Sequence, residues 1–482
     1  MKNRMRHRRC IMLFVLVLLV SVTACGLQSE EKLTVTSTPE EKIVSGQTEE
    51  GEDVSGGETQ ICDGRISEDA IGDWKSAYEN FFASSTKRVL AENSGENPQE
   101  AACLYSPVNF YLCLAMLSEM TANDTHDQIY ASMGTADQTC TGETTGCLES
   151  EEKGEKVRQS HLRMLRQWSQ KLYKRVESKQ CSLGNSVWLN AQIPFEKRVI
   201  QDVEEYYHGK STDGQMGSEG FDRQIQAWLN KQTKGKLQDA VSGVHTSSQD
   251  ALLLFSAIYF EDQWQIPFDK SKTKKETFYG AAFNTCGTIT EAEKTDAVTC
   301  DFLHGNMYLS TITAKQYQEA SIPMEHNTLH IILPQKGYGV SDLLDADKGV
   351  DLVKICDSEA KDRVYTEVEF SIPKLDFESA LNLKPIMKDM GIREVFQVGK
   401  ADFSPLTAED NLIYLNKATQ NSRLQWDENG CSVASYTEME AKAGAALPDE
   451  IIEMHCDRPF LFILTDEGDL PLFAGVVNRV GE

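Results

Sequence analysis

The sequence lacks the short motifs that most often mark a catalytic or redox site. It has no G-x-S-x-G elbow, no H-E-x-x-H motif and no C-x-x-C pair. The segment Gly209 to Thr212 resembles the end of a phosphate-binding loop, but Glu204 stands where the motif requires glycine. His326 and His330 have the spacing of a helical metal site, yet their segment has the pattern of a strand, which favours surface or hydrogen-bonded histidines. We therefore expect no catalytic residue, no metal ion and no cofactor.

Positive charge is also scarce. The chain of 482 residues has a formal net charge of −26, which argues against nucleic acid as a partner because phosphates are bound by Lys and Arg. Its hydrophobic share of 40% and charged share of 25% are ordinary for a globular protein. The length allows two or three average domains, or one large domain with extensions.

No apolar run is long enough to span a bilayer comfortably. The longest lies at the N-terminus, where basic residues precede Ile11 to Val22. This pattern predicts a cleaved signal peptide at residues 1–24. The junction Val22 to Cys25 resembles the lipobox of bacterial lipoproteins, in which the cysteine is lipidated; the alternative is an ordinary signal peptide with an incidental cysteine. We expect Cys25 to anchor the chain to the outer face of a bacterial cell membrane.

Aromatic residues are almost absent from the stretch that follows the junction. Residues 25–66 are rich in Ser, Thr, Gly and Glu, and such a segment cannot bury enough apolar area to form a core. We interpret it as a flexible, acidic tether. After Cys10 leaves with the signal and Cys25 takes the lipid, an odd number of cysteines remains in a domain too large to need disulfides. Cys140 and Cys147, in a polar loop, are the candidates for pairing.

Hydrophobic periodicity from about residue 67 onward predicts helices first and strands later. Ser106-Pro107 opens one helix as N-cap and first-turn proline, and a polar surface insertion is expected at 135–156. The predicted helices are 66–92, 107–117, 125–133, 161–176, 221–237 and 380–390. The predicted strands are 181–189, 252–260, 307–313, 317–323, 328–333, 364–372, 412–426, 460–465 and 470–477. Without βαβ alternation, this order indicates an α+β fold.

The stretch from Trp426 to Leu447 has the pattern of both a loop and a strand. With a period of two, one face carries only small or uncharged residues: Cys431, Val433, Ser435, Thr437, Met439 and Ala441. The other face carries Ser432, Ala434, Tyr436, Glu438, Glu440 and Lys442. Such alternation is typical of a half-buried strand, although the segment A-K-A-G-A-A-L-P resembles an exposed loop.

Several segments, in the same order along the chain, resemble motifs of the serpin family of protease inhibitors. The resemblance covers about residues 67 to 482. Its segments are Ser106-Pro107, Asn185 to Trp188, Phe221 to Leu237, Ala257 to Phe260 with Trp264 and Pro267-Phe268, Pro373-Lys374, Leu383 to Phe396, Ala401 to Ser404, Asp457 to Phe462 and Leu472 to Asn478. The resemblance implies three β-sheets, eight or nine helices and an exposed reactive-centre loop at about 428–458.

In this family the loop is attacked by a target protease, forms an acyl-enzyme with it and inserts into the large sheet as a new strand. The hinge motif of the family matches Glu428, Gly430, Cys431, Val433, Ala434, Ser435 and Thr437. Cys431 and Tyr436 depart from the usual residues. The alternation of the strand would turn the Tyr436 side chain outward, where its bulk can be tolerated. No charged residue would face the core, so we expect an inhibitor.

The family's spacing from Glu428 places the reactive bond at Gly444-Ala445, whereas counting back from Pro459 places it near Leu447. Small residues here favour an elastase-like or subtilisin-like target of serine type, with a cysteine-type target as an open alternative. Lys442 is the minority site for a trypsin-type target, and Ala446 is a further alternative.

The resemblance also implies contacts beneath the opening sheet. Trp264 matches the aromatic residue at the point where insertion begins, and Ser106 belongs to the same region. Ser256 and Gln420 replace an Asn and a His that bond each other in the family, and we expect them to preserve a side-chain hydrogen bond. We expect a monomer whose partner is the target endopeptidase. The alternatives are a non-inhibitory serpin-fold surface lipoprotein and a solute-binding lipoprotein.

Overall fold

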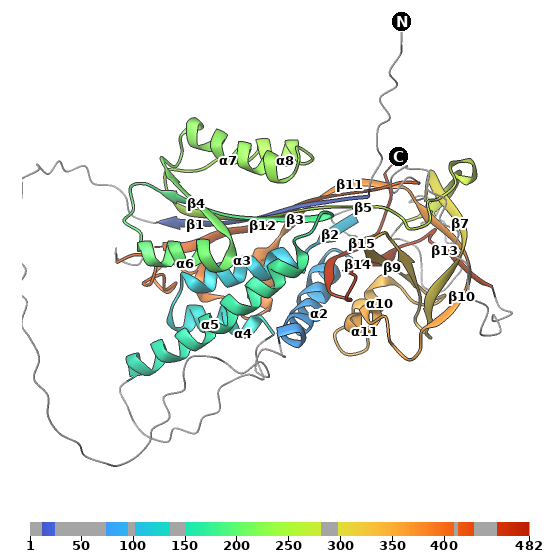
Figure 1. Cartoon of the computed structure of the whole chain (residues 1–482), viewed down its shortest axis with the longest axis horizontal. Helices are drawn as coiled ribbons and strands as arrows, with labels where there is room; N and C mark the ends of the chain where they lie inside the picture. The colour runs from blue at the N-terminus through green and yellow to red at the C-terminus, as the bar shows by residue number, and fades with distance from the viewer. Residues whose placement is uncertain are drawn as a thin grey trace, which may run out of the picture.

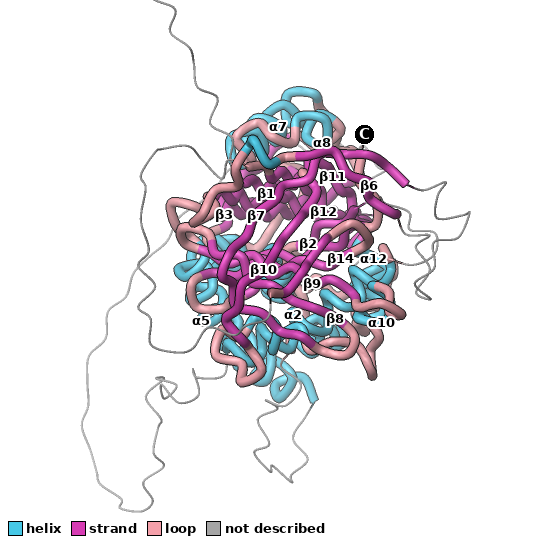
Figure 2. Tube along the Cα trace, turned by 90° about the vertical axis from the view of Figure 1, so that its right-hand side faces the viewer, coloured by secondary structure: helices cyan, strands magenta, loops and turns pink. Residues whose placement is uncertain are grey.

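The computed structural model describes residues 12–24, 74–94, 102–134, 150–280, 297–408, 413–428 and 451–481. Within these ranges it shows the mixed helices and strands that the sequence predicts (Figure 1). Figure 2 shows the layers: helices α7 (Glu219–Gln232) and α8 (Gln238–Ser242) lie above one sheet, and further strands and helices lie below it.

A six-stranded sheet crosses the molecule. Its strands follow the order β11-β12-β1-β5-β3-β4, so strands far apart in sequence are neighbours. Their bounds are β11 Leu375–Asn382, β12 Ile413–Trp426, β1 Met12–Ala24, β5 Asp250–Asp262, β3 Cys181–Asn190 and β4 Gly209–Gly214. The apolar run L-L-L-F-S-A-I-Y-F lies in β5, which is buried along almost its whole length, as expected for a strand covered on both faces.

A nine-stranded sheet has the order β13-β10-β7-β8-β9-β14-β15-β2, with β6 paired to β7. The long strand β7 joins two parts of it, because its first half pairs with β6 and its last residues pair with β8. These two parts and the six-stranded sheet are the three sheets expected. The bounds are β13 Ile452–His455, β10 Val364–Pro373, β7 Ala297–Thr313, β8 Tyr317–Pro323, β9 Asn327–Pro334, β14 Phe460–Asp466, β15 Pro471–Val477, β2 Ala102–Tyr105 and β6 Lys274–Tyr279.

The helices cover the six-stranded sheet on both faces, with α7 and α8 on one side and α3 to α6 on the other (Figure 1). Every residue of α3 is buried, and Ser106 caps the helix by accepting a hydrogen bond from Asn109 N, as the sequence predicts. The remaining bounds are α2 Trp74–Glu92, α3 Pro107–Glu119, α4 Asn123–Ser132, α5 Ser150–Val176, α6 Lys197–Tyr207, α10 Val340–Leu344, α11 Leu352–Cys356 and α12 Leu383–Asp389.

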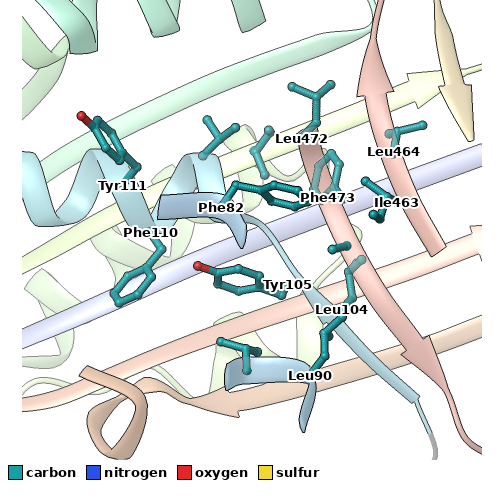
Figure 3. Close-up of a cluster of buried hydrophobic side chains, with 14 of the residues drawn as sticks. Phe82, Leu90, Leu104, Tyr105, Phe110, Tyr111, Ile463, Leu464, Leu472 and Phe473 are labelled. Atoms are coloured by element: carbon teal, nitrogen blue, oxygen red, sulfur yellow. The ribbon is translucent and has the colours of Figure 1, made fainter. Parts of the chain in front are cut away.

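The main core lies where α2 and α3 meet β2, β14 and β15 (Figure 3). Phe82 and Tyr105 lie there beside Phe473, and all three are fully buried. Phe473 also meets Phe260 of β5 edge to face, with ring centroids 5.9 Å apart. This contact packs the six-stranded sheet on the second sheet, so the two sheets share one core.

Several predicted boundaries are wrong. The helix predicted at 221–237 ends at Gln232, and the strand predicted at 307–313 begins at Ala297. Residues 380–382, expected to begin a helix, belong to β11, because Ala380 and Leu381 pair with Asn421 and Gln420 of β12 and sheet pairing overrides local helix propensity. Helix α5 begins at Ser150, inside the stretch expected as a surface insertion; residues 135–149 lie outside the described ranges. The sequence interpretation also missed the helices α6, α8, α10 and α11 and the strands β2, β4, β6 and β13.

The N-terminal apolar run forms strand β1 in the structure. Among the described residues, no helix has the length and apolar character that crossing a membrane requires. Removal of residues 1–24 as a signal peptide stays a prediction.

Candidate functional site

The candidate site begins with a strand position in the middle of the six-stranded sheet. Strand β1 fills this position and runs antiparallel to both of its neighbours, β12 and β5. Leu16 is paired with Ser422 on one side and Ile258 on the other, and Leu18 with Gln420 and Ser256. The sheet therefore accepts a strand of 13 residues between β12 and β5. We call this position the slot.

Strand β12 gives the slot one buried side and one partly exposed side. Ala418, Gln420, Ser422 and Leu424 are buried, whereas the residues between them are only half-buried. The buried set is mostly small or polar, and Ser422 donates a hydrogen bond of 3.1 Å to Leu104 O. A strand in the slot must therefore present alternate residues without charge toward the core.

Polar groups lie beneath the slot, at the start of α3. Ser106 N donates to Gln420 Oε1, and Gln420 Nε2 donates to Ser106 O, each over 3.2 Å. Asn109 Nδ2 donates to Ser256 O over 2.9 Å. The expected hydrogen bond between the side chains of Ser256 and Gln420 is absent, because β1 lies between the two strands; Ser256 Oγ has no hydrogen-bond partner among the described residues.

Trp264 follows β5 at one end of the slot. Its side chain is 2% exposed, and the indole Nε1 donates to Asp427 O over 2.9 Å. The ring meets Phe268 edge to face with centroids 5.6 Å apart. The structure thus places Trp264 against the residue that precedes Glu428, where the resemblance positions the start of insertion.

Glu428 is anchored at the same end. It accepts hydrogen bonds from Thr273 Oγ1 at 2.7 Å and from Lys374 Nζ at 3.1 Å. Burial alone would raise the pKa of Glu428, but the Thr273 hydroxyl and the Lys374 ammonium group outweigh burial and lower it below the usual value. The start of the loop is therefore held by a charged, hydrogen-bonded contact.

The next described residue after Glu428 is Ile451. Strand β13 then pairs in parallel with β10, where Ile452 lies opposite Val368. Cys456 N donates to Ser371 O over 2.9 Å and fixes the end of this strand. The segment 429–450 therefore joins the end of β12 in one sheet to the edge of the other.

Much of the predicted site falls in that segment. The positions outside the described residues are Gly430, Cys431, Val433, Ala434, Ser435, Thr437, Lys442, Gly444, Ala445, Ala446 and Leu447, together with Cys25, Cys140 and Cys147. The structure brings Trp264 and Glu428 together at one end of the slot, and it brings Ser106 and Gln420 together beneath it. Sequence reasoning missed Thr273 and Lys374 as anchors; the signal was the carboxylate of Glu428 itself, which requires a cation or donor once buried.

His330, which the sequence analysis considered as a metal ligand, lies in another sheet than the slot. His330 lies in β9 with its side chain 3% exposed, and its Nδ1 is 2.9 Å from Glu319 Oε1. Its Nε2 is 3.2 Å from Thr465 Oγ1. Its ring is thus a hydrogen-bonded core histidine, as the strand interpretation predicts.

Comparisons with known proteins agree with this geometry. The family model described as "Serpin (serine protease inhibitor)" matches residues 77–480. An alpha-1-antitrypsin-like protein from Ictidomys tridecemlineatus is 29% identical over 82% of this chain and 87% of its own length. Alpha-1-antiproteinase F from Cavia porcellus is 26% identical over 82% of this chain and 88% of its own length.

Solved structures show the same fold at lower identity. The native state of the thermophilic serpin tengpin has a TM-score of 0.63 at 20% identity and covers 84% of this chain and 94% of its own. Human thyroxine-binding globulin complexed with thyroxine has a TM-score of 0.65 at 20% identity, covering 85% and 100%. Together with the family match over most of its length, these likenesses establish that the chain belongs to the serpin family.

Proposed function

We propose that the chain inhibits a serine endopeptidase by inserting its cleaved loop between β12 and β5. Serpins as a family are protease inhibitors rather than catalytic enzymes, and they form covalent complexes with target proteases. The observation that carries the proposal for this chain is the slot. The strand in the slot begins beside the end of β5 that precedes Trp264 and beside the end of β12, and it runs antiparallel to both strands. A loop that follows β12 must run in this same direction to insert.

The length of the slot supports a specific reactive bond. Strand β1 has 13 residues, and the stretch Cys431 to Ala443 has the same length. If this stretch replaces β1 in register, the last inserted residue directly precedes Gly444. The bond Gly444-Ala445 then lies just beyond the far end of the slot, which is the alternative we favour over Lys442 and Leu447.

The same register matches the two faces of the loop to the two faces of β12. Val433, Ser435 and Thr437 take the places of Phe14, Leu16 and Leu18, opposite the buried Leu424, Ser422 and Gln420. Glu440 takes the place of Ser21, opposite the exposed Lys417. Uncharged residues thus face the core, and Glu440 lies on the other face opposite a lysine of opposite charge.

The chemistry is supplied by the target protease. Its serine hydroxyl attacks the carbonyl carbon of Gly444, an ester forms, the Gly444–Ala445 bond breaks, and the protease's general acid protonates the departing amine of Ala445. This chain contributes the strand that withdraws. Insertion adds ladder hydrogen bonds along β5 and β12, and the free energy that it releases carries the acylated protease to the far end of the sheet before hydrolysis.

Residues 1–24 bear directly on this proposal. In the full chain, β1 occupies the place that the loop must take. We propose that removal of the signal peptide vacates the slot, and that the mature chain beginning at Cys25 is the inhibitory form. A lipid on Cys25 and the acidic stretch 26–66 would then hold the serpin domain at the outer face of a bacterial cell membrane.

The proposal is tested by mixing the chain that lacks residues 1–24 with elastase-like and subtilisin-like proteases, then separating the products on denaturing gels. A stable adduct of higher mass is expected, together with a released C-terminal peptide. Mass spectrometry of that peptide is expected to show Ala445 at its N-terminus. Cleavage with no adduct for any of the proteases would overturn the inhibitor proposal and favour a non-inhibitory serpin-fold lipoprotein.

A further inference from the structure

Two histidines and an aspartate meet between helices α4 and α5, outside the slot. His126 and Asp127 lie on α4 and His161 lies on α5, and their ligand atoms all lie within 4.8 Å of one another. His126 is fully buried, His161 is half-buried and Asp127 is exposed. The three groups therefore run from the interior of the protein to its surface.

The protonation of His126 is set by its neighbours. Its Nδ1 lies 3.1 Å from Ser118 O and 3.0 Å from Ser118 Oγ. The carbonyl oxygen can only accept a hydrogen bond and the hydroxyl oxygen can also accept one, so a proton on Nδ1 satisfies both contacts. Its Nε2 therefore has a free lone pair, directed at His161 Nδ1 over 3.3 Å. Metal-bound histidines commonly donate their second N–H to a backbone carbonyl in this way, because that bond fixes the tautomer and the ring plane.

The spacing of the two nitrogens fits a shared ion. A tetrahedral ion with metal–nitrogen bonds of about 2.0–2.1 Å holds two ligand nitrogens about 3.3 Å apart. His126 Nε2 and His161 Nδ1 already have this separation of 3.3 Å. The exposed Asp127 side chain is free to rotate toward them and supply a carboxylate oxygen.

The surroundings hold the rings in place. Tyr130 stacks on His161 with centroids 3.7 Å apart. The guanidinium group of Arg158, a nearby cation, is engaged by Thr121 O at 2.7 Å and by Glu119 O at 2.9 Å.

We propose that His126, Asp127 and His161 form a zinc site that clamps α4 to α5. Two imidazoles and one carboxylate suit Zn²⁺ and its neighbours Ni²⁺ and Cu²⁺, whereas Mg²⁺ and Ca²⁺ prefer oxygen ligands alone. A water molecule completes four-coordination. The competing description is a direct hydrogen bond in which His161 Nδ1–H donates to His126 Nε2, with no ion.

Zinc titration of the chelator-treated, tag-free full chain separates these two descriptions. Isothermal titration calorimetry is expected to show one ion per chain with micromolar or tighter affinity, and zinc is expected to raise the melting temperature. Co²⁺ in its place is expected to give the visible absorption of a tetrahedral ion. Absence of binding, or an octahedral Co²⁺ spectrum, would overturn the proposal.

Variants locate the ion. His161→Gln and Asp127→Asn avoid the buried ring, and circular dichroism without metal checks their folding. His161→Gln is expected to weaken zinc affinity by more than about 100-fold, since even outer-shell partners change metal affinity by about 10–100-fold. His326→Gln is the matched control, because His326 belongs to a second group of possible metal ligands, with Asp262 and Glu325. Loss of binding in His326→Gln with retention in His161→Gln would contradict the assignment.

Discussion

A charge at one inward position of the loop tests the slot most sharply. In the register of β1, Thr437 takes the place of Leu18, between Gln420 on β12 and Ser256 on β5. Both of these neighbours are fully buried. Thr437→Arg would therefore bring an unpaired cation into the core when the loop inserts, at an effective cost of about 3 kcal/mol or more.

That cost falls on insertion alone, because the loop lies outside the slot when the protease first attacks it. Each 1.36 kcal/mol in a barrier is tenfold in rate, so about 3 kcal/mol slows insertion about a hundredfold. Hydrolysis of the acyl-enzyme then overtakes insertion. We expect Thr437→Arg to be cleaved as a substrate, with little adduct and a large rise in the number of inhibitor molecules consumed per protease inhibited.

The neighbouring residue provides the matched control. Glu438 takes the place of Leu19, opposite the half-buried Thr419 on the other face of β12. Glu438→Arg introduces the same side chain on the face of β12 that is only half-buried, so we expect a smaller cost of insertion than for Thr437→Arg. The assay titrates each variant, without residues 1–24, against the protease that forms an adduct with the unaltered loop. Equal behaviour of the two variants would refute the register.

Three further changes probe the ends and the filling of the slot. Trp264→Ala removes the hydrogen bond to Asp427 O and about 3–5 kcal/mol of packing, so native gels after mild heating are expected to show more polymer or latent form than Trp264→Phe does. The folded-state pKa of Glu428 is depressed below 4.5, so its anchor to Lys374 stabilises the fold above that pH and is lost as the pH falls through the depressed value. Acid melting curves of Glu428→Gln should therefore lack this part of the pH dependence, and an unchanged curve would count against the anchor. A chain that retains residues 1–24 is expected to form less adduct than the chain that begins at Cys25; equal yields would mean that β1 does not compete with the loop.

The sequence predicts those elements whose patterns are local. Strand β8 has the predicted bounds Tyr317–Pro323. The alternation of apolar and polar residues that predicts it lies entirely within these seven residues. The capped start of α3 at Ser106-Pro107 is equally local. The helix predicted at residues 380–382 is wrong, because these residues form a strand only through pairing with β12. That pairing is not visible in the local sequence.

The candidate site divides in the same way. The alternation from Cys431 to Ala441 is visible in the sequence, and it supplies the register argument. The anchor of Glu428 depends on Thr273, which is 155 positions away, and the pair His126–His161 joins two helices 35 positions apart. Contacts of this kind follow from the packing of distant elements, so a single sequence gives no sign of them.

Cleavage without inhibition measures the central claim directly. The chain without residues 1–24 is cut between Gly444 and Leu447 by a protease that does not stay bound, and thermal unfolding is followed before and after the cut. Insertion of the freed strand between β12 and β5 predicts a large rise in melting temperature. An unchanged or lower melting temperature would contradict the account, and it is the result expected of a solute-binding lipoprotein or of a serpin fold whose loop does not insert.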